Sequence, residues 1–362
     1  MEETPFPHQG PLAPDRVRGR DRLLADLVDK VTARQVTALL GPRRFGKTSL
    51  LGRLAADLSE VTTVRVDLYG ATSVLDVVGR FDAALDASDG PFRQAALLEA
   101  AKLQLTLGVA RVEMARPTRD RPDPAALLSN LLDVLVAAAL ATPTLLILDE
   151  FSSVRSAGNT AAVLRTKLQH HYRDVGLVFA GSEPSVMRAL FTDVAEPFFG
   201  QADLVEVGPL SAPAVLSILA EGFTSTGRDP GRAPSRVYEL TRGHPQRTML
   251  AAHTIWTATP PGATATDEVV VGAFDQLRSR VDAELRAAFD HHATGAQQVL
   301  RLVAHGQPVH GARAGALDLA KNTATHHRAR LLADGHLRND PERGLVVTDP
   351  LLGDWLRRQL PL

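Results

Sequence analysis

The fold of this chain is decided by one stretch, Gly41-Pro42-Arg43-Arg44-Phe45-Gly46-Lys47-Thr48. A short apolar run, residues 36–40, precedes it, and residues 48–58 follow it with apolar side chains at helical spacing. Residues 61–68 then alternate between apolar and polar side chains, as a strand does. Strand, loop, helix and strand in this order predict a βαβ unit, and therefore a parallel sheet in an α/β fold.

The same stretch fits the pattern G-x-x-x-x-G-K-[ST] without a mismatch. Glycines allow a tight loop whose backbone N–H groups converge on phosphate oxygens, and the positive end of the following helix faces those oxygens. In such a loop Lys47 reaches the β- and γ-phosphates, and the Thr48 hydroxyl ligates Mg²⁺. The alternative, a glycine turn with an exposed lysine, does not require the strand and helix on either side. The residues predicted to hold the nucleotide here are Gly41, Pro42, Arg43, Arg44, Phe45, Gly46, Lys47, Thr48 and Ser49.

A second acidic element supports this prediction. Residues 145–148 are apolar on both faces, as in a central strand, and Asp149 and Glu150 follow them. We expect Asp149 to hold Mg²⁺, directly or through a water molecule, and Glu150 to polarise the attacking water as general base. The alternative is a strand that ends in a solvated Asp-Glu turn. The predicted geometry seats a triphosphate on the amino end of a helix, with its metal held from the tip of an adjacent strand.

Length and composition predict a folded protein of several domains. The chain has 362 residues, 44% of them hydrophobic and 22% charged, and a net charge of -1. This charge argues against a protein that coats nucleic acid, although it permits a local basic face. The absence of Cys excludes disulfides and thiolate-ligated zinc. Because no apolar run approaches ~18 residues and no signal peptide is visible, we expect a cytoplasmic protein without a membrane partner.

The order of predicted elements divides the chain into four segments. These are a loosely held N-terminal arm (1–15), a P-loop nucleotide-binding domain (16–209), a helical lid (210–290) and a winged helix-turn-helix (291–362). The last assignment rests on helices followed by a small hairpin and a closing helix. Residues 88–122 exceed what the core requires, and their Pro/Arg-rich loop is either solvated or a partner-binding element.

Several short motifs, taken in order, resemble the archaeal-type ATPase family, a branch of the STAND signal-transduction ATPases related to AAA+ proteins. The motifs are Pro42 to Leu50, Asp149-Glu150, Ala180-Gly181-Ser182, Gly208-Pro209-Leu210-Ser211, Gly243-His244-Pro245, and Val347-Thr348-Asp349-Pro350-Leu351 through Trp355. The first two are specific to P-loop ATPases, whereas the others are short and individually weak. The resemblance covers most of residues 16–362.

The resemblance implies further site residues. Val17 and Arg20 lie in a segment that lines the adenine pocket in the family, and Ser182 resembles the polar sensor of the γ-phosphate. Pro245 is similar to the proline that packs on the adenine from the lid, and Arg247 to a lid arginine that reaches the phosphates. The alternatives are a loop-capping hydroxyl for Ser182, an ordinary helix start for Pro245 and a solvated helix arginine for Arg247.

The chain departs from the family before its last strand. Relatives often carry Gly-Arg there, whereas this chain has Gly200-Gln201. An arginine finger supplied to a neighbouring subunit therefore lacks its usual residue. Arg188 is a candidate substitute, with a surface arginine as the alternative.

Histidines and arginines near the C-terminus suggest two other ligands. Zinc is not predicted, because adjacent histidines on a helix cannot both face one ion. DNA would meet the third helix of the winged helix through Asn322, Arg328 and Arg330. Against DNA, neighbouring acidic residues dilute the positive face, and in STAND proteins this module often packs on the nucleotide domain instead. We therefore favour an intramolecular or protein contact.

Together these observations predict a slow ATPase, a molecular switch with ATP or ADP and Mg²⁺ as cofactors, whose lid and winged helix respond to the nucleotide. ATP rather than GTP rests on the resemblance, since no Asn-Lys-x-Asp motif is present. One alternative is a DNA-binding AAA+-type loader or initiator. Another is a non-hydrolysing, nucleotide-bound scaffold for a partner protein. The partners that we expect are an unidentified protein, DNA through the winged helix, or further copies in a nucleotide-dependent oligomer.

Overall fold

The computed structural model describes residues 3–103 and 123–362. These residues fall into two compact units, each described here by itself. The sheet unit contains residues 22–41, 47–103 and 123–206, and the helical unit contains residues 3–21, 42–46 and 207–362.

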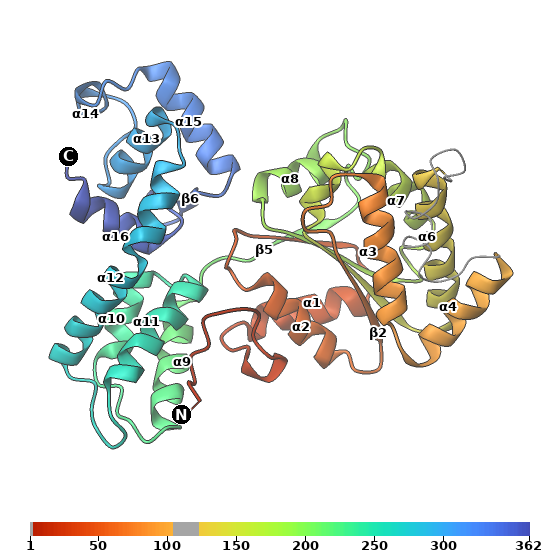
Figure 1. Cartoon of the computed structure of the whole chain (residues 1–362), viewed down its shortest axis with the longest axis horizontal. Coiled ribbons are helices and arrows are strands. Elements are labelled where there is room, and N and C mark those ends of the chain that lie inside the picture. The colour runs from red at the N-terminus through yellow and green to blue at the C-terminus, as the bar shows by residue number, and fades with distance from the viewer. Residues whose placement is uncertain (1–2, 104–122) are drawn as a thin grey trace. The chain divides into compact units, whose positions relative to one another are not determined.

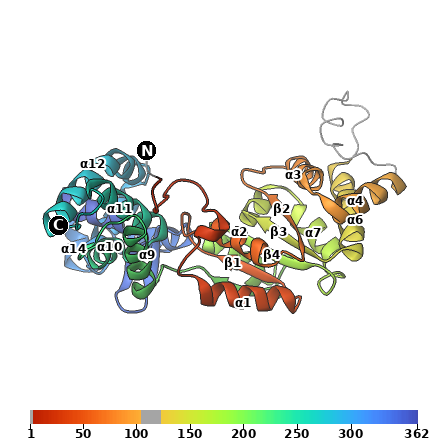
Figure 2. The same cartoon turned by 90° about the horizontal axis from the view of Figure 1, so that it is seen from below.

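The sheet unit is built on five parallel strands in the order β2-β3-β4-β1-β5 (Figures 1 and 2). Their bounds are β1 (Thr37–Leu40), β2 (Thr62–Asp67), β3 (Thr144–Asp149), β4 (Gly176–Gly181) and β5 (Asp203–Glu206). The central strands β1, β3 and β4 are buried along their whole length, which explains their continuous apolar runs.

The strand order corrects one expectation. Because β4 lies between β1 and β3, the strand before loop 41–48 and the strand that ends at Asp149 are not adjacent. All five strands are parallel, however, so both strands still end at the same edge of the sheet. The extra strand brings a third segment, the residues after Gly181, to that edge between them.

Helices complete the sheet unit, with α1 and α3 on opposite sides of the sheet in Figure 2. The helices are α1 (Asp21–Thr32), α2 (Lys47–Asp57), α3 (Val74–Ala87), α4 (Gly90–Lys102), α6 (Pro124–Ala141), α7 (Thr160–Leu168) and α8 (Pro184–Thr192), with a 3-10 turn η3 (Phe151–Ser156). The sequence analysis missed α8. The part of the unassigned stretch from residue 104 to 122 lies outside the described residues.

By length and composition α6 is apolar enough to cross a membrane. Half of this helix is buried, and it packs against α3, α4 and α7. A core helix of this kind passes the same test, so the packing accounts for the apolar sequence.

The helical unit consists of two helix groups that share one hydrophobic core (Figure 1). The first group is α9 (Ala212–Thr224), α10 (Ala233–Thr241), α11 (Pro245–Ala258) and α12 (Asp267–Asp290); the second is α13 (Thr294–Ala304), α14 (Ala312–Ala316), α15 (Lys321–Ala333), β6 (Leu337–Asp340), β7 (Gly344–Val347) and α16 (Pro350–Gln359). In the second group β6 and β7 form an antiparallel hairpin after three helices, the element order expected of a winged helix-turn-helix. Between α14 and α15 the chain leaves the helical conformation, and Asp318 there has a left-handed backbone with φ 55°.

The N-terminal segment is not loosely held, contrary to expectation. Phe6 is completely buried in the core of the helical unit, and its ring lies 5.5 Å from that of Phe223. Gly222 provides the space, since a Cβ there would lie 2.4 Å from the Phe6 ring. A single aromatic residue therefore anchors a segment whose composition alone resembles a mobile arm.

Candidate functional site

Loop 41–48 makes a tight turn that opens directly into α2. Arg44 and Gly46 have positive φ angles of 67° and 80°. A Cβ on Gly46 would meet nothing within 4 Å, so the backbone angle rather than space favours glycine there. The ammonium of Lys47, a residue only 5% exposed, donates a hydrogen bond of 2.7 Å to the carbonyl of Gly41. Thr48 follows in the first turn of α2 and is half-buried.

Asp149, the last residue of β3, is 3% exposed and has two partners within the sheet unit. One carboxylate oxygen accepts a 3.0 Å hydrogen bond from the backbone N–H of Glu150. The other forms an ion pair with the guanidinium of Arg65 on the neighbouring strand β2. The sequence analysis missed Arg65, although the alternation along β2 places it opposite the buried Val64 and Val66.

Glu150 and Ser182, predicted for separate roles, lie in direct contact. The Glu150 carboxylate accepts hydrogen bonds from the backbone N–H of Ser182 at 3.1 Å and from its hydroxyl at 2.8 Å. Ser182 is 4% exposed and follows β4, the strand beside β3. Glu150 has a left-handed backbone with φ 51°, a conformation that costs roughly 1–3 kcal/mol and persists only where contacts hold it.

Buried phenylalanines support the tips of β3 and β4. They form one cluster with ring centroids 4.5 to 6.0 Å apart: Phe151, Phe179, Phe191 and Phe198. At the end of β4, a Cβ on Gly181 would lie 2.5 Å from Met187 of α8, so glycine is needed for close approach. We call Lys47, Arg65, Asp149, Glu150 and Ser182 the sheet-edge site.

In the helical unit, Val17 and Arg20 belong to the segment before α1. Val17 is buried, and Arg20 donates a 2.6 Å hydrogen bond to the carbonyl of Gly208. Burial lowers the pKa of Arg20 to about 10. Phe45, from loop 41–48, is buried with its ring edge-on to that of His244 at 4.8 Å. Their nucleotide contacts stay predictions.

Two of the short motifs pack on each other. The backbone N–H of Leu210 donates a 2.8 Å hydrogen bond to the carbonyl of Gly243, which has φ 74°. A Cβ on Gly243 would lie 2.0 Å from the carbonyl oxygen of Leu210, so no other residue fits. His244 then caps α11, accepting a 3.4 Å hydrogen bond from the Arg247 backbone, and burial lowers its pKa to about 4. Pro245 occupies the first position of α11, which leaves its adenine contact untested.

Arg247 is buried, so the alternative of a solvated helix arginine is wrong. Its guanidinium binds the Asp349 carboxylate at 2.6 Å and that of Glu284 at 3.2 Å. Arg44 of loop 41–48 binds the same Glu284 carboxylate at 2.6 Å. Burial alone would lower the pKa of Arg247, but the charges and hydrogen bonds of Asp349 and Glu284 outweigh it and raise that pKa. A phosphate contact of Arg247 stays a prediction.

The remaining candidates lie on the surface of their units. Arg188 forms an ion pair with Glu206. Asn322, Arg328 and Arg330 are exposed on α15, and Arg330 lies 3.6 Å from the Asp334 carboxylate. Within residues 3–103 and 123–362, no group of three or more acidic, histidine or cysteine side chains is arranged to hold a metal ion.

Comparison with known proteins identifies the fold. No family model and no curated protein matches the sequence. A Walker-type ATPase of Pyrococcus abyssi superposes with a TM-score of 0.70 at 16% identity, over 98% of this chain and 100% of that one. The chain has an AAA+ P-loop ATPase fold. The ORC2 protein of Aeropyrum pernix, solved as ADPNP-ADP complexes, has a TM-score of 0.58 at 14% identity over 98% of each chain. The ORC1 protein of the same organism, solved in complex with DNA, superposes with a TM-score of 0.50 at 13% identity. The superposition covers 95% of this chain and 93% of the ORC1 chain.

Proposed function

We propose that this chain binds ATP with Mg²⁺ at loop 41–48 and hydrolyses it slowly, as a switch of the STAND/AAA+ type. The observation that carries the proposal is the contact of Glu150 with Ser182 beside Asp149, at the sheet edge where β1 also ends. A buried carboxylate held by a neighbouring hydroxyl, one residue from a second buried carboxylate, suits a general base next to a metal ligand.

The residues present fit a nucleotide and its metal. Lys47 opens α2, an 11-residue helix, and backbone N–H groups at a helix start bind phosphate oxygens. The Thr48 hydroxyl and the Asp149 carboxylate are oxygen ligands of the kind that Mg²⁺ prefers, and the ion would neutralise charge on the phosphates. Buried carboxylates are either paired or bound to metals. Since Asp149 is paired with Arg65, direct binding of the metal to this carboxylate would require the ion pair to open.

Each residue has a role in the proposal. Lys47 binds the β- and γ-phosphates, and Glu150 orients the attacking water and accepts its proton. Ser182 holds the Glu150 carboxylate and senses the γ-phosphate. In the helical unit, Val17, Arg20 and Pro245 form the adenine pocket, and Arg247 contacts the phosphates.

A chain of ion pairs in the helical unit supports the switch. Arg44 of loop 41–48 and Arg247 of α11 share the carboxylate of Glu284 on α12, and Arg247 also binds Asp349 at the start of α16. A ligand that draws Arg247 away leaves Asp349 without its ion-pair partner, whereas one that draws Arg44 away leaves Glu284 paired with Arg247 alone. The loop, the lid and the winged helix would thereby respond together. For these domains we keep the predicted boundaries, 16–209 for the nucleotide domain, 210–290 for the lid and 291–362 for the winged helix.

The site assignment is tested by nucleotide binding. In Lys47→Ala we expect the affinity for a fluorescent ATP analogue to fall by at least about 100-fold, since a charge-assisted contact to two phosphates is lost. The matched control is Lys30→Ala, which removes an ammonium on α1 that pairs with Asp203. Unchanged ATP binding in a folded Lys47→Ala protein would refute the assignment. Tightly retained nucleotide without phosphate release in the wild-type protein would instead favour the non-hydrolysing scaffold for a partner protein.

A second candidate is DNA binding by the winged helix, as in a loader or initiator. It is favoured by Asn322, Arg328 and Arg330, all exposed on α15, and by the likeness to the ORC1 protein solved with DNA. Salt-dependent binding of duplex DNA that is lost in Arg328→Ala/Arg330→Ala would support it. No binding at low salt, with or without ATP, would exclude it. A nucleotide-dependent oligomer and a cytoplasmic location are further parts of the proposal.

A further inference from the structure

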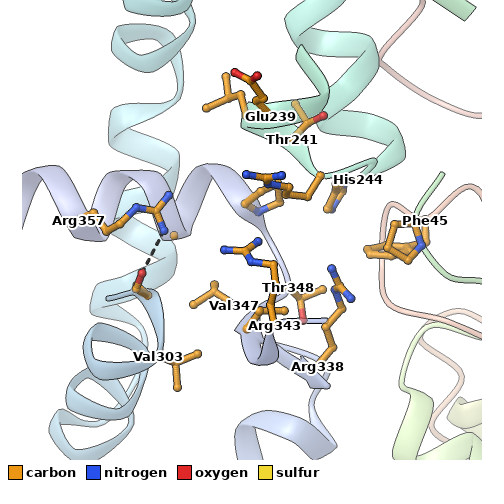
Figure 3. A pocket seen from close by; sticks show the side chains of 17 residues that line it. Phe45, Glu239, Thr241, His244, Val303, Arg338, Arg343, Val347, Thr348 and Arg357 are labelled. Carbon is orange, nitrogen blue, oxygen red and sulfur yellow. Dashed lines mark hydrogen bonds between the residues drawn. The ribbon is translucent and has the colours of Figure 1, made fainter. Parts of the chain in front are cut away.

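The helical unit contains a pocket whose arginine side chains have no role in the proposal above. Its walls come from α10, α13, the β6-β7 hairpin and α16, and its volume is about 100 Å³ (Figure 3). That is room for several water molecules or one small oxyanion, and too little for a nucleoside triphosphate or a duplex.

Positive charge dominates the lining of this pocket. The arginines that line it are Arg242, Arg338, Arg343 and Arg357. Figure 3 shows Arg338 and Arg343 of the hairpin and Arg357 of α16 in the lining, and the Arg357 guanidinium donates a 3.0 Å hydrogen bond to the carbonyl of Ala304. Within the described residues, Glu239 is the single acidic side chain of the lining, and it binds Arg236 at 3.0 Å. We call these four arginines with Thr348 the arginine pocket.

The donors of the arginine pocket are incompletely partnered. Arg338 pairs with Asp340 at 2.9 Å, but its buried Nε has no hydrogen-bond partner in the described part of the chain. In that same part, the Arg242 and Arg343 side chains form no ion pair or hydrogen bond. Because few carboxylates neutralise the positive charge of these guanidinium groups, the pocket favours an anionic ligand.

Thr348 provides an independent observation. It is 8% exposed, lines the pocket beside Arg343 and Arg338, and its buried hydroxyl has no partner among residues 3–103 and 123–362 (Figure 3). An unmade hydrogen bond of a buried hydroxyl costs roughly 1–3 kcal/mol, so native structures rarely retain one without a ligand or water.

The arginines also influence one another. Burial lowers the pKa of Arg357; the charge of Asp354 opposes this shift, and the charges of Arg343, Arg242 and Arg358 add to it. Arg242 has a left-handed backbone with φ 48° at the end of α10, a conformation that is uncommon for a residue with a side chain. A bound anion would relieve the repulsion among these guanidinium groups.

We propose that the arginine pocket binds a small, multiply charged oxyanion, namely a phosphate or pyrophosphate group. Guanidinium groups match the oxygens of phosphate with paired N–H donors, and the Thr348 hydroxyl donates one more hydrogen bond. The group is either free inorganic anion or the end of a phosphorylated small molecule. Phe45 of loop 41–48 also lines the pocket, but the four arginines and Thr348 lie outside that loop, so the proposal does not depend on the ATPase proposal.

Pyrophosphate binding to the full-length Lys47→Ala protein tests the proposal, measured by calorimetry at low salt. We expect one site that weakens on the order of tenfold in Arg343→Ala and again in Arg242→Ala, as charge-assisted hydrogen bonds are lost. Both arginines are exposed, so these variants are expected to fold. Thr348→Val, nearly the same shape, is expected to weaken binding several-fold. The matched control is Arg358→Ala, which removes the next arginine on α16, one that pairs with Asp354 outside the pocket.

Several outcomes would overturn the proposal. They are no pyrophosphate binding in Lys47→Ala, equal binding in Arg242→Ala/Arg343→Ala and in the parent protein, or an equal loss in Arg358→Ala. Failure of the ATPase proposal looks different, because ATP would then bind the wild-type and Lys47→Ala proteins equally well, and adding Arg242→Ala/Arg343→Ala to Lys47→Ala would leave that ATP binding unchanged. Inorganic phosphate, pyrophosphate and ADP are compared in the same assay. Competition by ADP identifies the phosphate end of a nucleotide as the source, and its absence identifies the free anion; both support the site.

Discussion

The sheet-edge site and the arginine pocket arrange their charges in opposite ways. At the sheet edge, Lys47 is hydrogen-bonded to Gly41, Arg65 pairs with Asp149, and Glu150 accepts from Ser182. In the arginine pocket, by contrast, Arg338 is the one lining guanidinium, within the described residues, with a carboxylate partner.

This difference has consequences for binding. A ligand at the sheet edge must replace contacts that already exist, so its binding is coupled to rearrangement of those side chains. A ligand in the arginine pocket adds contacts where donors are unmet, so its binding mainly stabilises the folded protein. The sheet edge therefore suits a switch, and the pocket suits a stabilising anion.

The largest expected effect is at the Glu150-Ser182 contact. In Glu150→Gln we expect ATP hydrolysis to slow by about 100-fold to 1000-fold, because the general base is lost, while ATP binding changes by less than a few-fold. Ser182→Ala, which leaves the base but removes the hydroxyl that holds it, is expected to slow hydrolysis by roughly tenfold. Phosphate release and analogue binding measure the two steps separately. Hydrolysis at the wild-type rate in Glu150→Gln would contradict the role of Glu150.

The next effect concerns the stability of the helical unit, where Arg247 is fully paired, unlike the arginines of the arginine pocket. Arg247→Gln removes a buried cation that is fully compensated, leaving Asp349 and Glu284 without it. We expect the free energy of unfolding to fall by about 3 kcal/mol, since breaking a buried ion pair leaves an uncompensated charge. Urea denaturation measures it.

A matched control comes from α10. Arg236→Gln removes an exposed arginine that pairs with Glu239, and a change within about 0.5 kcal/mol is expected. If Arg247→Gln behaved like Arg236→Gln, the ion-pair chain would not be a structural link between α11, α12 and α16.

A third prediction concerns pH. The pKa of buried His244 is about 4, against an ordinary 6.5, so between these values the unfolded chain binds a proton that the folded protein excludes. The free energy of unfolding should therefore fall as pH decreases from 6.5 to 4, by up to about 3 kcal/mol from this residue.

His244→Asn isolates this contribution. Asparagine retains a side-chain acceptor at the start of α11 but does not titrate. We expect its unfolding free energy to depend less on pH between 4 and 6.5, the remaining slope including His292, whose pKa burial also lowers to about 4. An unchanged slope would show that His244 is not buried in its neutral form.

The smallest effect concerns Arg65, the partner that Mg²⁺ must displace from Asp149. In Arg65→Gln we expect the Mg²⁺ concentration needed for ATP-analogue binding to fall by about threefold to tenfold. Arg80→Ala, which removes an exposed arginine of α3, is the control. A weaker response to Mg²⁺ in Arg65→Gln would instead indicate that Arg65 contributes to the nucleotide site.

Local sequence patterns determined much of the sheet unit. Loop 41–48 requires the backbone angles that its glycines allow and places Lys47 at the start of a helix. The apolar run before Asp149 requires a buried strand that ends at that residue. Both requirements can be read from residues that are close in the sequence. The parallel sheet follows from them.

The tertiary structure decided what depends on residues far apart in the sequence. The placing of β4 between β1 and β3, and with it the contact of Ser182 with Glu150, depends on strand order, which periodicity does not encode. Phe6 in the helical core and four arginines around one pocket are likewise long-range results. The physical reason is that the sequence specifies which side chains are apolar or charged, whereas packing alone determines which of them lie together.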